Sequence, residues 1–220
     1  GKLKQGDAEK KFLKDASDLK DAIQKNCWDG RDGFFYSVDI NLRPIVDTPG
    51  TYIGLKLVLH SGFPRSYDCL IQRLGVWSGF MAMWAGIATL EQAKRMVNEH
   101  LKNKKTFAAP YGIRTLSKME KMYSVRASNN PSNWFGPIWG ISNYMVFKGL
   151  VNYKFKTEAK DIASKTIILF GRDFEKNEAL HEYYEPDSGE PVMNKGFQNW
   201  NYLVMNMLAW MEGRTVVEEF

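Results

Sequence analysis

The chain has 220 residues, 44% of them apolar, and a formal net charge of +5. This length can bury a hydrophobic core, and a single domain over residues 1–220 is the simplest expectation. Lys and Glu are mixed along most of the sequence. The basic stretches Lys2–Lys20 and Lys102–Lys105 lack interleaved aromatic residues, so nucleic acid is not an expected partner. No apolar run reaches the ~18 residues of a membrane-spanning helix, so no membrane association is expected.

The N-terminal part of the chain predicts a helix, a hairpin and a loop. Residues 7–26 place apolar side chains at helical spacing above a face of Lys and Asp. The stretch WDGRDGFFYSVDI (28–40) alternates apolar residues with D-G turn signals, which predicts a short hairpin or an ordered loop. Residues 41–64 contain repeated Pro and Gly and predict a loop.

Further helices are expected in the remainder of the chain. Thr89, followed three residues later by Gln92, forms a capping-box pattern that begins the helix TLEQAKRMVNEHLKN. The other helical segments are either apolar nearly all round, and therefore buried, or amphipathic. Apolar helices are predicted at 71–88, 136–153 and 196–212, an amphipathic helix at 157–172, and irregular loops at 104–133 and 178–195.

The alternation of buried and amphipathic helices favours two concentric layers, because a helix that is apolar all round must be covered on both sides. The sequence therefore predicts an all-α domain of roughly six helices arranged as helical hairpins. Long loops rich in aromatic residues recur at one end of the apolar helices, and we expect a pocket there.

The loop at 178–195 and the segment after it concentrate acidic and aromatic residues. LHEYYEPDSGEPVMNKGFQNWNY (180–202) holds the carboxylates Glu182, Glu185, Asp187 and Glu190 among Tyr, Phe and Trp. Two interpretations stay open from the residues alone. The acids can solvate a turn, for which EPDSGEP is a plausible sequence. Alternatively, one of them can be a catalytic base on an ordered loop among hydroxyl and amide groups.

Trp residues beside Asn, Gly and Asp are typical of sugar-binding sites, because a pyranose lays its C–H groups on an aromatic face. In NWFGPIW, Trp134 and Trp139 can contact a sugar or can pack the start of a helix. Trp77 and Trp84 lie in an apolar segment and are expected in the core, although Trp77 could reach a pocket from the helix start.

No metal or cofactor is expected. The His and Cys residues lack the spacing of a metal site or a catalytic triad. Asp29 and Asp32 do not have the spacing of a calcium loop, and a turn explains them better.

Several segments occur in a consistent order with sensible spacing. They are WDGRDGFFYSVD, LGVWSGFMAMWAGIATLEQAKRMV, NWFGPIWGISNYMVFKGL, HEYYEPDSGEP and GFQNWNYLVMNM, and they cover most of the chain from Trp28 onward. Together these motifs resemble glycoside hydrolase family 63, the family of mannosyl-oligosaccharide glucosidase. Its bacterial relatives include glucosylglycerate and mannosylglycerate hydrolases, and trehalases carry a similar pattern.

The resemblance implies an (α/α)6 toroid, of which this chain would be about the C-terminal half. It also implies inverting hydrolysis of an α-glucosidic or α-mannosidic bond. Glu182 would be the general base, because it matches the E-x-Y of trehalases, and the general acid would be an Asp that precedes residue 1. Phe135 occupies a position at which relatives often carry Arg or another polar residue. We expect this difference to change which leaving group the site accepts. The substrate-binding residues would be Trp134, Trp139, Gln198, Glu190 and Tyr183.

Other classes of function stay open. A non-catalytic carbohydrate-binding or self-assembling half-toroid would bind sugar without hydrolysis. A helical interaction scaffold would bind no sugar, and the aromatic loops disfavour it. A half-toroid would expose more apolar surface than monomers usually tolerate. We therefore expect carbohydrate as the ligand, together with self-association or pairing with an N-terminal half.

Overall fold

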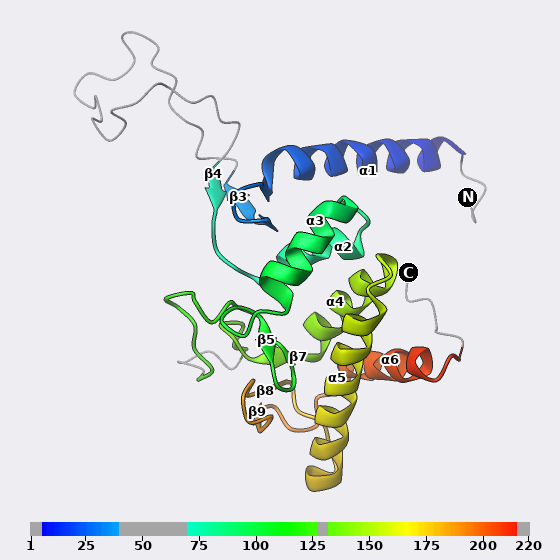
Figure 1. Ribbon diagram of the computed structural model, residues 1–220. Coiled ribbons are helices and arrows are strands. Elements are labelled where there is room, and N and C mark those ends of the chain that lie inside the picture. The colour runs from blue at the N-terminus through cyan, green and yellow to red at the C-terminus, as the bar shows by residue number, and fades with distance from the viewer. Residues whose placement is uncertain (1–5, 40–69, 127–131, 215–220) are drawn as a thin grey trace. The chain divides into compact units, whose positions relative to one another are not determined.

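The structure is a computed structural model that describes residues 6–39, 70–126 and 132–214 (Figure 1). The predicted loop at 41–64 lies outside these residues. The chain divides into two compact units, one formed by residues 1–28 and 36–73 and the other by residues 29–35 and 74–220. The expectation that residues 1–220 are the C-terminal half of one catalytic domain stays a prediction.

The first unit contains the predicted N-terminal helix. Helix α1 (Gly6–Asn26) has acidic residues in its first turn and Lys25 in its last turn, an arrangement that favours the helix dipole. None of its residues is buried, and Phe12, Leu13 and Leu19 are exposed. In the same unit β3 (Ser37–Asp39) pairs antiparallel with β4 (Leu70–Gln72).

The predicted hairpin near residue 30 is present. Strands β1 (Trp28–Asp29) and β2 (Phe34–Phe35) form a two-stranded sheet. The Asp29 carboxylate is buried and accepts the backbone N–H groups of Arg31 at 2.9 Å and Asp32 at 3.3 Å. Asp29 therefore holds the turn, as the sequence predicted.

The second unit is built around helices α4 (Gly140–Asn152) and α5 (Lys156–Asn177), which run side by side (Figure 1). Helix α4 is buried on nearly every side, whereas α5 buries only one face, so both predicted helix types are confirmed. Helix α2 (Met81–Trp84) packs against α4, and α6 (Val204–Met211) packs against α5. A short 3₁₀ helix, η4 (Asn199–Leu203), leads into α6.

The predicted helix that begins at Thr89 is also confirmed. Helix α3 (Leu90–Arg95) starts with a capping box, in which Thr89 Oγ1 accepts from Gln92 N at 3.2 Å and Gln92 Oε1 accepts from Thr89 N at 2.7 Å. The helix continues as a π-helical segment, η3 (Met96–Leu101).

The predicted buried helix over residues 71–88 is wrong in most of its length. Only the 3₁₀ segment η2 (Trp77–Phe80) and the single turn of α2 are helical there. Long-range hydrogen bonds replace helical ones, from Gly75 N to Glu120 Oε1 at 2.8 Å and from Trp77 N to Thr115 O at 2.9 Å. An apolar run does not by itself distinguish a helix from a buried irregular segment.

The all-α expectation also needs correction, because the helix-rich chain contains short sheets. Strands β5 (Ala108–Ala109) and β6 (Gly112–Ile113) form a hairpin. Strands β7 (Ile138–Trp139), β8 (Tyr183–Tyr184) and β9 (Pro191–Met193) form a three-stranded sheet in that order. Strand β7 runs directly into α4, so this sheet lies at the N-terminal end of the most buried helix. The half-toroid stays a prediction.

Over the residues that the structure describes, no helix combines the length and hydrophobicity needed to cross a bilayer.

Candidate active site

Glu182 lies immediately before strand β8 and is 7% exposed. Its backbone N–H donates to Met193 O at 3.1 Å, which adds the residue to the β8–β9 pair. Asn194 Nδ2 donates a hydrogen bond to Glu182 Oε2. Asn194 has a φ of 53°, a left-handed conformation that Asn adopts more readily than most residues. The structure therefore holds a buried carboxylate against an amide donor on a tight turn.

Four aromatic rings stack in a row that ends at Tyr183, the residue after Glu182. The centroid distances are 6.2 Å from Trp77 to Trp134, 3.8 Å from Trp134 to Trp139 and 5.2 Å from Trp139 to Tyr183. Successive ring planes differ by 21°, 16° and 17°. We call these residues the aromatic row. It joins a predicted core residue, Trp77, to three residues that the sequence assigned to the site.

The members of the aromatic row differ in exposure. Trp139 is fully buried, both of its faces are covered by neighbours in the row, and its Nε1 donates to Asn133 O at 2.8 Å. Trp134 and Trp77 are partly exposed. Trp139 is thus placed to support the row, whereas the partly exposed Trp77 ends it and the partly exposed Trp134 lies between Trp77 and Trp139.

Tyr183 is fully buried, and among the residues that the structure describes its hydroxyl has no hydrogen-bond partner. Burial raises the pKa of Tyr183 above its ordinary value, and the charge of Glu182 raises it further. Trp200, whose ring centroid lies 6.0 Å from that of Trp139, also has a buried and unpartnered Nε1. Buried polar groups normally find a partner, so these two donors mark positions where a water or a ligand hydroxyl can bind. Sequence reasoning missed Trp200 as a site residue, although it lies within the GFQNW motif.

The other acids of the loop are occupied elsewhere. Glu190 forms an ion pair with Lys176 at 2.9 Å, and both side chains are exposed. Glu185 Oε2 accepts the backbone N–H groups of Asp187 and Ser188, so it serves the turn as expected. Glu182 alone of the four acids is buried, and a catalytic role for it stays a prediction.

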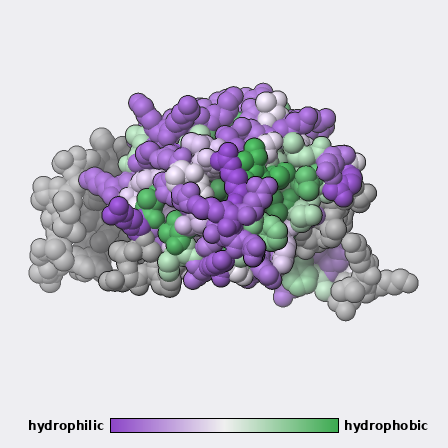
Figure 2. Space-filling model, turned by 90° about the horizontal axis from the view of Figure 1, so that it is seen from below, coloured by the Kyte–Doolittle hydropathy of each residue, from purple (hydrophilic) through white to green (hydrophobic). Residues whose placement is uncertain are grey.

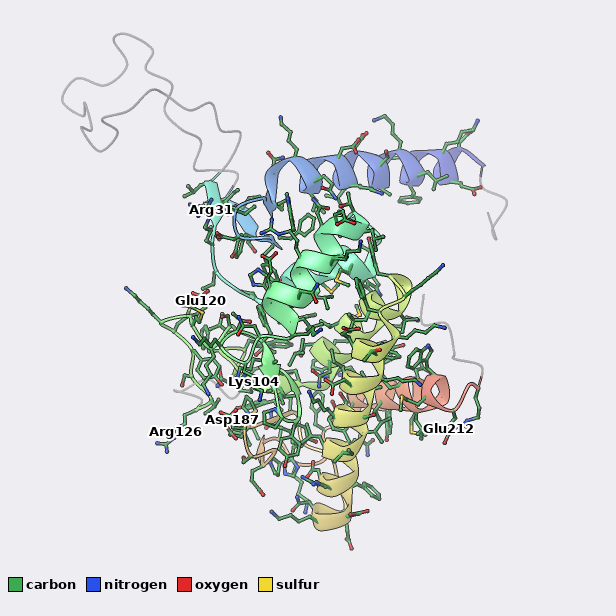
Figure 3. The ribbon with its side chains drawn as sticks, in the orientation of Figure 1. Arg31, Lys104, Glu120, Arg126, Asp187 and Glu212 are labelled. Carbon is green, nitrogen blue, oxygen red and sulfur yellow. The ribbon has the colours of Figure 1, made fainter. Side chains whose placement is uncertain are left out.

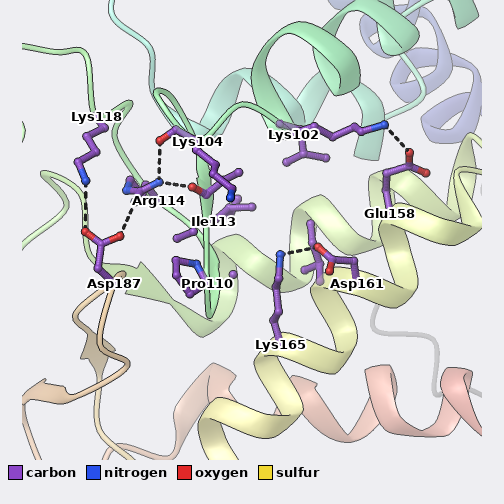
Figure 4. Close-up of a pocket in the computed structure, with 15 residues that line it drawn as sticks. Lys102, Lys104, Pro110, Ile113, Arg114, Lys118, Glu158, Asp161, Lys165 and Asp187 are labelled. Carbon is purple, nitrogen blue, oxygen red and sulfur yellow. Dashed lines mark hydrogen bonds and ion pairs between the residues drawn. The ribbon is translucent and has the colours of Figure 1, made fainter.

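Asp187 does more than serve the turn. It lies on the loop between β8 and β9, on the same side of this unit as Lys104 (Figure 3). Its carboxylate pairs with Arg114 at 2.8 Å and with Lys118 at 3.2 Å (Figure 4). Arg114 is only 3% exposed and also donates to Ala108 O. The pair therefore ties the acidic loop to the β5–β6 hairpin.

These charges line a cavity of about 610 Å³ between the β5–β6 hairpin and α5 (Figure 4). Its other carboxylates are paired as well, Glu158 with Lys102 at 3.5 Å and Asp161 with Lys165 at 2.6 Å. Glu182 is not among its lining residues. No member of the aromatic row lines the cavity either, so the cavity is separate from the row, and its carboxylates are all held in ion pairs.

Gln198 is exposed and lines a largely apolar groove of about 370 Å³ between α5 and α6. The structure thus brings Glu182, Tyr183, Trp139 and Trp134 together, and it places Gln198 in the groove and Glu190 at the surface. Substrate contact by these last two residues stays a prediction. In the described part of the chain, no group of three or more His, Cys, Asp or Glu residues could hold a metal ion.

Comparisons of the sequence with known proteins all point to glycoside hydrolases. The sequence model of the mannosylglycerate hydrolase MGH1-like glycoside hydrolase domain matches residues 2–201. A probable trehalase of Eremothecium gossypii is 28% identical over 173 residues, which is 77% of this chain and 19% of that protein. Mannosylglycerate hydrolase MGH1 of Selaginella moellendorffii is 27% identical over 137 residues, 61% of this chain and 24% of that protein. The chain therefore spans a quarter or less of these relatives.

Solved structures show the fold. The mannosylglycerate hydrolase of family 63 from Thermus thermophilus, in complex with glucose, has a TM-score of 0.58 at 20% identity. The match covers 87% of this chain and 38% of that one. Neutral trehalase Nth1 from Saccharomyces cerevisiae also has a TM-score of 0.58, at 18% identity over 87% of this chain and 28% of that one. The helix-rich fold is thus similar to that of proteins in the family 63 and trehalase (α/α)6 class.

Proposed function

This chain belongs to the mannosylglycerate hydrolase MGH1-like glycoside hydrolase family, and on that premise we propose that it carries the general-base side of an inverting α-glycosidase site. The observation that carries the proposal is the buried Glu182 carboxylate, which Asn194 holds and which Tyr183, the last member of the aromatic row, follows in sequence. The substrate class is an α-glucoside or α-mannoside, as for the trehalase and mannosylglycerate hydrolase relatives.

The geometry around Glu182 supports a role as base. A general base must accept a proton from a bound water and must keep its own orientation while doing so. Asn194 donates to Oε2, and among the described residues Oε1 has no hydrogen-bond partner. Oε1 is therefore the atom that takes the proton from water, while the amide holds the other oxygen. The water then attacks the anomeric carbon, and the leaving group departs from the opposite face.

The sugar is contacted by the partly exposed members of the aromatic row. Trp77 ends the row, so its partly exposed ring suits the C–H face of a pyranose, and the partly exposed Trp134 adjoins it. Tyr183 Oη and Trp200 Nε1 supply donors to sugar hydroxyls, because both atoms are buried and neither has a partner within residues 6–39, 70–126 and 132–214. In this proposal Trp139 acts as the support of the row.

The general acid comes from outside these 220 residues. Inverting enzymes need two carboxyl groups roughly 6.5–9.5 Å apart, and the acid must carry a proton. Asp187 and Glu190 are held in ion pairs with Arg114 and Lys176, and a carboxylate in an ion pair is a poor proton donor. An upstream Asp, as the resemblance implies, would complete the site.

The test is hydrolysis of α-glucosides and α-mannosides, including glucosylglycerate, mannosylglycerate and trehalose. It compares the wild type with Glu182→Gln and with a matched control, Glu175→Gln, an exposed residue of α5. Both the chain alone and the longest natural polypeptide that contains it are assayed. We expect turnover only in the longer form, loss of at least about 100-fold in Glu182→Gln, and no loss in the control. Proton NMR of the first product tests inversion at the anomeric carbon.

Each contrary outcome identifies the part that fails. Activity of the chain alone would place the acid inside it. Full activity of Glu182→Gln would remove Glu182 from the base role, and retention of configuration would remove the inverting mechanism. Sugar binding without hydrolysis in every form, unaffected by Glu182→Gln, would favour the alternative of a non-catalytic carbohydrate-binding or self-assembling half-toroid.

A further inference from the structure

Asp173, near the C-terminal end of α5, is a carboxylate that is 4% exposed and surrounded by donors. Both His181 Nδ1 and the His181 backbone N–H lie 2.9 Å from its Oδ2. Tyr184 Oη donates to the same oxygen at 2.7 Å, and Asn177 Nδ2 donates to Oδ1 at 2.8 Å. A carboxylate has about four acceptor sites, so Asp173 is saturated by protein donors.

Two of these partners flank Glu182. His181 precedes it, and Tyr184 follows two residues later on strand β8. From the other side, Asn201 Nδ2 donates to His181 O at 2.8 Å. The ring, N–H and carbonyl of His181 are therefore all held by side chains of α5 and η4. A regular strand pair forms without such contacts. These additional hydrogen bonds therefore fix the position of the backbone that precedes Glu182.

The protonation states of Asp173 and Tyr184 keep the hydrogen bond between them in place near neutral pH. Burial raises the pKa of Asp173, but hydrogen bonds from His181, Tyr184 and Asn177 outweigh it, so the pKa is lowered overall. Burial, together with the hydrogen bond to Asp173, raises the pKa of Tyr184 far above its ordinary value. Asp173 stays ionised and Tyr184 stays protonated near neutral pH, so the acceptor and the donor persist.

We infer that Asp173 is a positioning residue, which fixes the direction of the Glu182 carboxylate through His181 and Tyr184 without touching the substrate. This inference rests on the proposed role of Glu182 as base. A purely structural Asp173 would contribute to the free energy of unfolding, and its replacement would leave the turnover of the folded protein unchanged. Replacement of a positioning Asp173 would lower kcat while KM stays nearly constant, because the substrate contacts come from other residues.

The experiment compares Asp173→Asn with Thr166→Val in the polypeptide that shows turnover. Thr166 lies two turns earlier on α5, is 1% exposed, and accepts a hydrogen bond from Asn143 Nδ2 at 3.0 Å. Thr166→Val removes this hydrogen bond and also destabilises the buried side of α5. It does so at a position whose hydrogen bonds, among the described residues, do not involve those around Glu182. We expect Asp173→Asn to lower kcat by about 100-fold, the cost of a misplaced catalytic group, with KM within about threefold. Thr166→Val is expected to keep kcat within about threefold at a similar loss of stability.

A conservative replacement gives a rescue test. His181→Asn keeps an N–H donor near the position of Nδ1, whereas His181→Ala removes it. We expect His181→Asn to retain more kcat than His181→Ala. Equal kcat in the two variants would show that the ring's hydrogen bond to Asp173 does not position Glu182.

Hydrogen exchange gives a readout that needs no activity. The Glu182 amide, which bonds Met193 O, is expected to exchange faster in Asp173→Asn than in Thr166→Val at equal free energy of unfolding. Equal exchange in the two variants, or equal kcat, would overturn the inference. Failure of the proposed function has a different signature, which is full activity of Glu182→Gln whatever the result for Asp173.

Discussion

Trp139 and Tyr183 face each other across the β7–β8 pair, where they are register partners. Their ring centroids are 5.2 Å apart, and their planes differ by 17°. Both side chains are fully buried. Trp139 precedes α4 and Tyr183 follows Glu182, so this stack connects the central helix of the unit to the strand that carries the candidate base.

Removal of Trp139 should therefore cost much stability. Trp139→Ala is expected to lower the free energy of unfolding by about 3–5 kcal/mol, the usual range for a fully buried large aromatic. Urea denaturation followed by circular dichroism measures the change. Trp134→Ala is the matched comparison, because its ring is partly exposed. Similar losses in the two variants would contradict the distinction between a supporting and a ligand-facing ring.

Breaking the link between Asp187 and Arg114 should loosen the acidic loop. Asp187→Ala leaves a guanidinium that is 3% exposed without its counter-ion, and we expect a loss of about 1.5–3 kcal/mol. Lys118→Ala removes the exposed partner of the same carboxylate and should cost less than about 1 kcal/mol. Denaturant unfolding of both variants tests this order, and a larger loss for Lys118→Ala would contradict it.

The Asn194 amide should support turnover by holding the Glu182 carboxylate. Asn194→Gly keeps the left-handed conformation and removes only the donor to Oε2. We expect kcat to fall by about 10-fold, the equivalent of a lost hydrogen bond to a charged group. Asn194→Asp places a second carboxylate beside Glu182, and the repulsion should lower kcat further. Steady-state kinetics of both variants measure the change, and an unchanged kcat in both would count against the hydrogen bond to Glu182.

Asp173 should make folding stability depend on pH in acid. Its folded-state pKa lies below the unfolded value of about 3.9. Its contribution is therefore present above the unfolded pKa and is lost as pH falls through the lower folded pKa. The stability difference between wild type and Asp173→Asn should therefore shrink as the pH falls below about 4. Urea unfolding at a series of pH values measures this difference in the free energy of unfolding. A difference that grows in acid would contradict a lowered pKa of Asp173.

The chain should associate with a second copy or with an N-terminal half. The groove between α5 and α6 contains the exposed side chains Phe174, Tyr202 and Met205. Hydrophobic patches also interrupt the mostly hydrophilic face in Figure 2. We expect a native mass above one chain, and a shift toward one chain in Met205→Lys. Met119→Lys, at an exposed position outside the groove, is the control. A one-chain mass with no binding of a hydrophobic dye would contradict this expectation.

Local sequence signals determined the helices that have clear caps or periodicity. The capping box at Thr89 and the patterns that became α1, α4 and α5 were readable, because helix formation depends on contacts three or four residues apart. The apolar run at 71–88 predicts a helix and does not form one, because its backbone N–H groups donate hydrogen bonds to residues far along the chain, such as Thr115 and Glu120. A local pattern does not reveal such distant partners.

The sequence by itself also determined the family and the small set of acids that contains Glu182. Tertiary structure alone decided which acid is buried, because Glu185 and Glu190 share the same motif and the same chemistry. It also decided that Asp173, an ordinary acid near the end of an amphipathic helix, meets the backbone before Glu182. The burial of a carboxylate depends on donors that other segments bring to it. Here Asn194, after β9, donates to Glu182, and His181 and Tyr184 donate to Asp173 at the end of α5.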